Sequence, residues 1–239
     1  MSQHWSPAPD SAEIIAATAR LLDTARTLSD ADVLAPSLLP GWSRGHVLSH
    51  IARNADGLVN LLHWAATGVE HPQYADSGAR DAAIEAGAGR PAAEQVADIE
   101  QGHGRFIDAV DLVPAENWEN EVRWVSGDPR PANKILESRI REVVIHHVDL
   151  DAGYSASDWP SALAFRVLVS VVPAFEKRQM TPVTLLPTDV DAQLTVSGGS
   201  KVEVMGEAHQ LATWMLGRDS GAGLEWTGAR TLPKPPAWT

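Results

Sequence analysis

The sequence contains no cysteine among its 239 residues. This absence excludes disulfide bonds, thiolate metal sites and a thiol nucleophile supplied by the protein, so any sulfur chemistry here would need an external thiol. No run of about 18 apolar residues occurs either, and no membrane-spanning helix is therefore predicted. The first residues show neither the basic segment nor the apolar core of a signal peptide, and we expect a cytoplasmic protein.

Positive charge is also scarce in the chain. With 19 Lys and Arg against 31 Asp and Glu, the formal net charge is −12, and the basic residues form no stripe. This balance argues against a nucleic-acid partner, because binding to phosphates requires a basic face. The hydrophobic content of 44% and the charged content of 21% indicate a folded chain with a sizeable core. The length favours two domains over one.

Apolar residues recur at helical spacing in four segments of the first part of the chain. Asp10 and Glu13 resemble a capping box at the start of the first segment, and Ser43 and Gly68 are typical of a start and a stop for the second. A short helix is predicted at about 78–86, and an extended connection at 118–124. The four main helices are predicted at about 11–28, 44–66, 92–113 and 132–152. Four such helices with one longer connection predict a bundle.

The pattern changes after Gly153. Asp158-Trp159-Pro160 indicates the start of a helix that runs to about Lys177, and a second helix is predicted at 207–216. Short strands are predicted at 183–186, 193–196, 201–204 and 224–226. We therefore expect an α+β protein, with a four-helix bundle over residues 1–154 and a smaller α+β domain over residues 155–239.

The fourth predicted helix carries a possible metal-binding pair. Glu142 and His146 lie one helical turn apart on one face, and Asp149 continues that face. A carboxylate and an imidazole arranged in this way can share one metal ion. The best candidate for a third ligand is His50, on the second helix. Two histidines and one glutamate would leave one tetrahedral position open, as in catalytic zinc sites.

Other interpretations of these histidines remain open at this stage. A Glu-x-x-x-His pair is common on amphipathic helices that bind no metal. His147 is displaced from the face of His146 by about 100°. His46 lies one turn before His50 and offers a rival pair on the same helix, with Glu142 as the remaining ligand. His103 lies on an apolar seam, where a structural role is the usual one.

Two segments of the sequence resemble known signatures. Residues 39–55, followed by 61–68, resemble the N-terminal signature of the mycothiol-dependent maleylpyruvate isomerase family, which is part of the DinB-like group of metal-binding four-helix proteins. Residues 138–150 resemble the second signature of that family. The resemblance continues into residues 216–221 and the ending at 235–238, and so covers nearly the whole chain.

The resemblance implies a ligand set and a catalytic residue. It puts zinc, or another divalent metal, on His50, Glu142 and His146, and it puts a catalytic arginine at Arg218, which would reach from the smaller domain towards the metal. Without the resemblance, Arg218 would be interpreted as a surface cation just past the C-terminus of a helix, where positive charge is favoured.

The activity implied by the family is the cis–trans isomerisation of maleylpyruvate to fumarylpyruvate, in the gentisate route of aromatic catabolism. Mycothiol would be the cofactor, because reversible addition of its zinc-activated thiolate makes the double bond transiently single. The expected partners are a small dicarboxylate substrate and this thiol, and neither a nucleic acid nor a membrane is expected. The oligomeric state is not predicted, and a monomer is one of the possible states. Alternatives are a mycothiol S-transferase, a non-catalytic metal-binding module, and a hydrolase that activates water on the metal.

Overall fold

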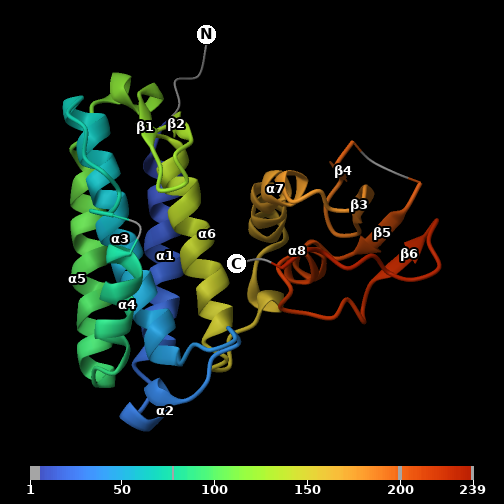
Figure 1. The fold of residues 1–239 in the computed structure, drawn as a ribbon, viewed down its shortest axis with the longest axis horizontal. Coiled ribbons are helices and arrows are strands. Elements are labelled where there is room, and N and C mark those ends of the chain that lie inside the picture. The colour runs from blue at the N-terminus through green and yellow to red at the C-terminus, as the bar shows by residue number, and fades with distance from the viewer. Residues whose placement is uncertain (1–5, 77, 199–200, 238–239) are drawn as a thin grey trace. The chain divides into compact units, whose positions relative to one another are not determined.

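The computed structural model describes residues 6–76, 78–198 and 201–237. The chain divides into two compact units, residues 1–153 and 154–239 (Figure 1). The first unit is built on four long helices, α1 (Ala8–Ala25), α3 (Arg44–Thr67), α5 (Ala92–Asp111) and α6 (Lys134–Asp149). Helix α3 packs against α5 and α6, and α1 packs against the same two helices. This closed arrangement is the predicted four-helix bundle, and the α+β class predicted for the chain is confirmed.

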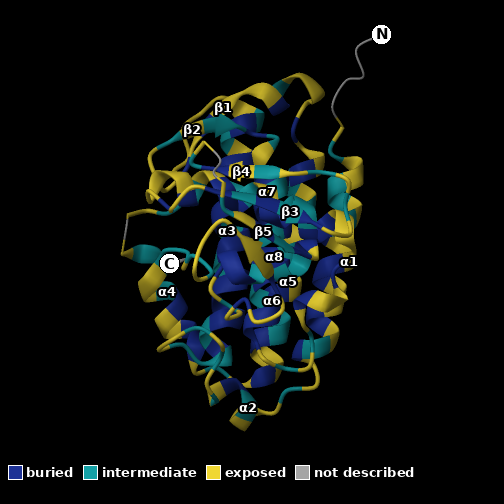
Figure 2. Ribbon diagram, turned by 90° about the vertical axis from the view of Figure 1, so that its right-hand side faces the viewer, coloured by how far each residue is buried: buried dark blue, intermediate teal, exposed yellow. Residues whose placement is uncertain are grey.

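An apolar stripe on each long helix forms the core of the bundle. Buried and exposed segments alternate along the helices (Figure 2), as expected for amphipathic helices around a common core. Fully buried members of these stripes include Ile14, Leu21, Ile51, Leu58, Ile99, Phe106 and Val143.

The ends of α3 follow directly from the sequence. The Ser43 hydroxyl oxygen accepts a hydrogen bond from the backbone N–H of His46 at 3.3 Å, and Gly68 ends the helix with φ = 73°. Both predicted signals are confirmed. The start of α1 was predicted wrongly, because the helix begins at Ala8 after Pro7, and Asp10 lies in its first turn. Proline has a backbone angle suited to a helix start, so no capping side chain is needed there.

Shorter elements connect the long helices. Helix α2 (Asp30–Leu34) was not predicted, whereas α4 (Ala79–Ala88) corresponds to the short helix expected at 78–86. The connection at 118–124 is extended only in part, because its first residues belong to the 3-10 helix η1 (Ala115–Glu119). Strand β1 (Glu121–Arg123) then pairs antiparallel with β2 (Pro129–Pro131).

Within its described residues, 154–198 and 201–237, the second unit contains two α-helices and a four-stranded sheet. The helices α7 (Ser161–Lys177) and α8 (Ala208–Met215) pack against each other, and the 3-10 helix η2 (Ala156–Asp158) precedes them. The strands are β3 (Val183–Pro187), β4 (Leu194–Val196), β5 (Glu203–Gly206) and β6 (Glu225–Thr227). Their order is β4-β3-β5-β6, in which only β3 and β5 run parallel. Over the described ranges, no helix of either unit is long and apolar enough to cross a membrane.

Candidate metal centre

Helices α3 and α6 bring the three predicted ligands together. One potential ligand atom from each of His50, Glu142 and His146 lies within 4.8 Å of the other two. His50 Nε2 is 2.9 Å from Glu142 Oε2, and His146 Nε2 is 3.4 Å from the same oxygen. Two imidazole nitrogens thus converge on one carboxylate oxygen. The side chains are only 4%, 21% and 14% exposed, respectively, so the group is largely sheltered from water.

The rival histidines are engaged elsewhere. His46 Nδ1 accepts a hydrogen bond from the backbone N–H of Ser43 at 3.1 Å, and its Nε2 lies 3.2 Å from Glu85 Oε2. His147 is buried against α1, where its Nε2 is 2.7 Å from Thr24 Oγ1. Neither side chain belongs to the converging group, and neither does His103 on α5. Among the residues that the structure describes, His50, Glu142 and His146 form the one such group.

Asp149 fixes the orientation of His146. Its carboxylate oxygen Oδ2 accepts a hydrogen bond from His146 Nδ1 at 2.9 Å, and the residue is fully buried. A carboxylate behind a histidine is the usual outer partner of a metal-bound imidazole, because it places the ring hydrogen on the nitrogen that faces away from the metal. The backbone carbonyl of Asp149 also accepts a hydrogen bond from the N–H of Leu38 at 2.9 Å, which ties the loop before α3 to the end of α6.

His50 has different neighbours. Its Nδ1 lies 3.2 Å from Nη2 of Arg80, on the first turn of α4, and because a guanidinium has no acceptor, the arginine donates this hydrogen bond. Trp42 approaches the His50 ring edge-on at 5.7 Å between centroids. The rings of His50 and His146 are nearly perpendicular, with centroids 4.5 Å apart. No sequence pattern indicated a role for Arg80, although it lies within the short helix predicted at 78–86.

The pKa values describe how protons are distributed over the group. Burial and the neighbouring His146 lower the pKa of His50 to about 4, although hydrogen bonding to Glu142 acts in the opposite direction. Burial would also lower the pKa of His146, but hydrogen bonds to Asp149 and Glu142 outweigh it and raise this pKa to about 9. Burial would raise the pKa of Glu142, but its two histidine partners hold it well below the ordinary value. Without a metal, the group therefore consists of a neutral His50, an ionised Glu142 and a protonated His146.

These donors suit a divalent metal ion. Two imidazoles and one carboxylate are the protein ligands of many catalytic zinc sites and leave at least one position open. His50 is already neutral, Glu142 is already ionised, and only the proton between His146 and Glu142 has to leave. The donor set and its outer carboxylate thus fit the metal that the sequence predicts at His50, Glu142 and His146.

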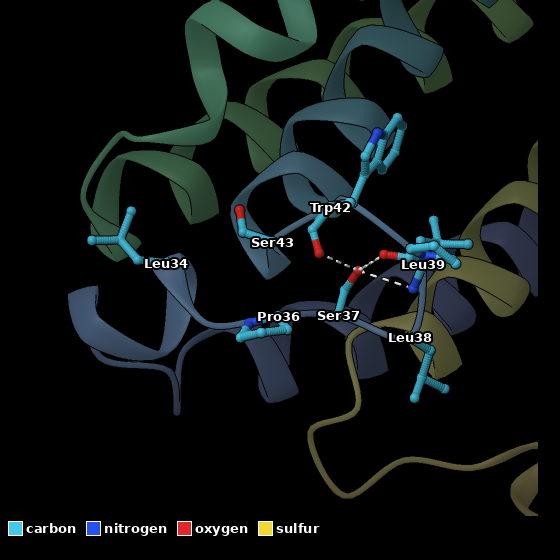
Figure 3. A pocket seen from close by; sticks show the side chains of 9 residues that line it. Leu34, Pro36, Ser37, Leu38, Leu39, Trp42 and Ser43 are labelled. Atoms are coloured by element: carbon cyan, nitrogen blue, oxygen red, sulfur yellow. Dashed lines mark hydrogen bonds between the residues drawn. The ribbon is translucent and has the colours of Figure 1, made fainter.

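A pocket of about 380 Å³ lies at the entry to α3. It is formed by the end of α2 and the loop that leads into α3, over residues 34 and 36–43 (Figure 3). The Ser37 hydroxyl holds the loop in place by donating to the Trp42 carbonyl at 2.9 Å and accepting from the Leu39 N–H at 3.1 Å. Trp42 is one of the lining residues, and its ring lies 5.7 Å from that of His50 between centroids, but none of His50, Glu142 and His146 lines the pocket.

A positively charged side chain is buried in the bundle one turn before Glu142. Arg139 is fully buried, and its Nη1 donates to the Ile51 carbonyl and to Asn54 Oδ1, both at 2.8 Å. Burial lowers the pKa of Arg139 to about 10, which still leaves it charged at neutral pH. In the sequence, the only indication of this burial is the position of Arg139 among the apolar residues of α6, since buried arginine is rare.

Arg218 lies in the second unit. It follows α8 and Gly217, which has φ = 71°, a backbone conformation typical of the residue that ends a helix. Arg218 Nη1 donates a hydrogen bond to the Leu216 carbonyl at 2.7 Å. This contact agrees with a cation at the C-terminus of a helix, and the catalytic role of Arg218 stays a prediction.

Comparisons with known proteins agree with the site and the fold. A family model described as the mycothiol maleylpyruvate isomerase N-terminal domain matches residues 14–151, more than half of the chain. The crystal structure of the mycothiol-dependent maleylpyruvate isomerase is 27% identical, with a TM-score of 0.89, and the alignment covers 98% of both chains. A histidine-to-alanine mutant of that isomerase is 26% identical, with the same TM-score and coverage. The comparison with curated proteins gives no match. The chain therefore belongs to the mycothiol-dependent maleylpyruvate isomerase family.

Proposed function

We propose that the protein is an enzyme that converts maleylpyruvate to fumarylpyruvate with mycothiol as its cofactor. The observation that carries this proposal is the likeness to the mycothiol-dependent maleylpyruvate isomerase, which extends over 98% of both chains. The converging group of His50, Glu142 and His146 supports it independently, because it offers a metal site with an open position. We further propose that the protein acts in the cytoplasm, where small thiols are kept reduced.

The reaction sets clear demands on the site. A carbon–carbon double bond does not rotate unless it becomes a single bond for a time. A bound divalent metal would supply a deprotonated thiol at neutral pH, and that thiol would supply a nucleophile whose reversible addition allows the rotation. The absence of cysteine is consistent with a nucleophile that belongs to the cofactor.

The residues of the chain have distinct parts in this proposal. His50, Glu142 and His146 hold the metal, and Asp149 keeps His146 turned towards it through the 2.9 Å hydrogen bond. Burial of the group limits access of water, which would otherwise compete for the open position.

The substrate is proposed to be held by cations. A dicarboxylate requires positive partners, and Arg141 Nη2 lies 3.8 Å from Glu142 Oε1, beside the metal-binding group. We assign Arg218 to the stabilisation of negative charge on the reacting substrate, on the basis of the family resemblance. The net charge of −12 does not oppose such a substrate, because the local field of the metal and the arginines decides its binding.

An absorbance assay tests the function. Zinc-loaded protein is mixed with maleylpyruvate, with and without mycothiol, and formation of fumarylpyruvate is followed. We expect turnover only with the thiol, and we expect it to disappear in His50→Ala. The control is His63→Ala, since His63 lies on the same helix and its ring contacts His71 at 4.7 Å instead of the metal-binding group. Arg218→Ala should lose most turnover while it keeps the metal.

Other outcomes would point to the alternatives. Consumption of mycothiol without return, measured by thiol titration, would replace the isomerase with an S-transferase that uses the same ligands. Conversion of a substrate in the complete absence of thiol would indicate a metal hydrolase. Tight zinc binding without any turnover, together with an Arg218→Ala variant that leaves the biological readout intact, would support a non-catalytic module.

A further inference from the structure

The two histidines of the metal-binding group have opposite partners at Nδ1. His146 Nδ1 faces the carboxylate of Asp149 at 2.9 Å, whereas His50 Nδ1 faces the guanidinium of Arg80 at 3.2 Å. Both rings direct Nε2 towards the same oxygen of Glu142. The first arrangement is the one expected behind a metal ligand, and the second is not.

The hydrogen bond from Arg80 to Nδ1 of His50 is incompatible with a metal bound at Nε2 of the same ring. A neutral imidazole that binds a metal through one nitrogen carries its hydrogen on the other, so Nδ1 of His50 would become a donor. The guanidinium of Arg80 can also only donate hydrogen bonds, because it has no acceptor atom. Two donors at 3.2 Å repel each other, and the guanidinium has to leave His50 when the metal binds.

Little else holds Arg80 against His50. Its Nη1 pairs with Asp81 Oδ1 at 2.7 Å, but the two side chains are 31% and 71% exposed, and a pair so open to water contributes little. The remaining neighbour is Tyr74: burial raises the pKa of its hydroxyl, and the positive charge of Arg80 acts in the opposite direction. The guanidinium is therefore attached to the edge of the metal-binding group by weak contacts, on a side chain long enough to turn.

We propose that Arg80 is an anion-binding residue of the metal centre, held by His50 while the metal is absent and released by the metal to bind a carboxylate of the substrate. This assignment rests on the proposed function, because it requires the metal at His50, Glu142 and His146. It gives the enzyme an order of binding, in which the cation that attracts the dicarboxylate becomes available only after the metal is in place.

The test compares Arg80→Met with the wild-type protein. Zinc affinity is measured by competition with a chelator, and the affinity of the zinc-loaded protein for maleate is measured by calorimetry without any thiol. In Arg80→Met, we expect zinc to bind about fivefold more tightly, because a competing hydrogen bond is lost. We expect maleate to bind at least about tenfold more weakly, because a charged partner is lost.

Two further variants keep the result interpretable. Arg80→Lys retains a positive charge and should recover part of the maleate affinity. Arg105→Met is the matched control, since Arg105 lies on α5 and pairs with Asp56, away from the group, and both affinities should equal those of the wild type. Nitrogen NMR of labelled histidine should show the hydrogen of His50 moving from Nε2 to Nδ1 when zinc is added.

The outcomes separate this inference from the proposed function. If the wild-type protein binds no zinc, the proposed function is overturned and this inference with it. If zinc binds normally but maleate affinity is unchanged in Arg80→Met, only the inference is overturned. An Nδ1 of His50 that stays without hydrogen in the zinc-loaded protein would also refute it.

Discussion

Metal binding should weaken strongly as the pH falls, because a proton occupies the site in the metal-free protein. The pKa of His146 is raised to about 9, so at pH 7 this ring is protonated and has to lose its hydrogen at Nε2 before it can bind a metal. Each pH unit below about 9 then costs about tenfold in affinity. Between pH 9 and 7 the loss is about 100-fold, or roughly 2.7 kcal/mol.

The other two ligands do not contribute over this interval. The pKa of His50 is about 4 and that of Glu142 is well below its ordinary value, so both are already in the state that binds metal. Competition with a chelator at several pH values measures the affinity, and calorimetry in buffers of different ionisation enthalpy counts the protons released. Histidine NMR of the metal-free protein should show His146 titrating near pH 9. An affinity that is constant between pH 7 and 9, or titration of His146 near its ordinary value of 6.5, would refute the reasoning.

Three further predictions concern single residues. Asp149→Asn should weaken metal binding about 10- to 100-fold at pH 9.5, measured by chelator competition, because the carboxylate that orients His146 is lost. The metal-free protein should lose on the order of 3 kcal/mol of its free energy of unfolding between pH 6.5 and 9. The raised pKa of His146 stabilises the fold fully below pH 6.5, and this stabilisation is lost as the pH rises through about 9. Denaturant unfolding of the wild type and of His146→Gln at several pH values checks this. Ser43→Ala should lower the stability measured by thermal unfolding by about 1 kcal/mol, since the N-cap of α3 is lost. Gly45→Ala should lower it more, because the new methyl group would overlap the backbone carbonyl of Ala88. Equal losses of stability in the two variants would contradict this ranking.

Helix α3 shows what the sequence can predict. Its N-cap serine and its terminal glycine act locally, within one turn, so the pattern is sufficient to place both ends. The alignment of Glu142 with His146 is equally local, because the helical period alone puts them on one face. Helix α2 was missed, since five residues provide too little periodicity, and its own capping box lies in a segment without an apolar repeat.

The parts of the site that could not be predicted depend on contacts between distant segments. His50 and Glu142 are 92 residues apart, and their pairing came from the family resemblance and not from spacing. The position of Arg80 beside His50 depends on how α4 packs on α3, and no short-range pattern records that packing. His46 and His50 look alike in the sequence, and their partners in the fold distinguish them: His46 Nδ1 accepts a hydrogen bond from the Ser43 backbone N–H, whereas His50 Nε2 lies 2.9 Å from Glu142 Oε2.

The joining of α3 and α6 at the metal-binding group also has a kinetic consequence. Because its ligands come from helices 92 residues apart in sequence, an unfolded chain cannot present them together, and the group exists only after the bundle has closed. A metal that binds here would recognise the native state alone. Added zinc should therefore slow unfolding and leave the folding rate nearly unchanged, because the transition state for folding would still lack the complete site. In a cell, the folded bundle would then last longer when more metal is available to bind it.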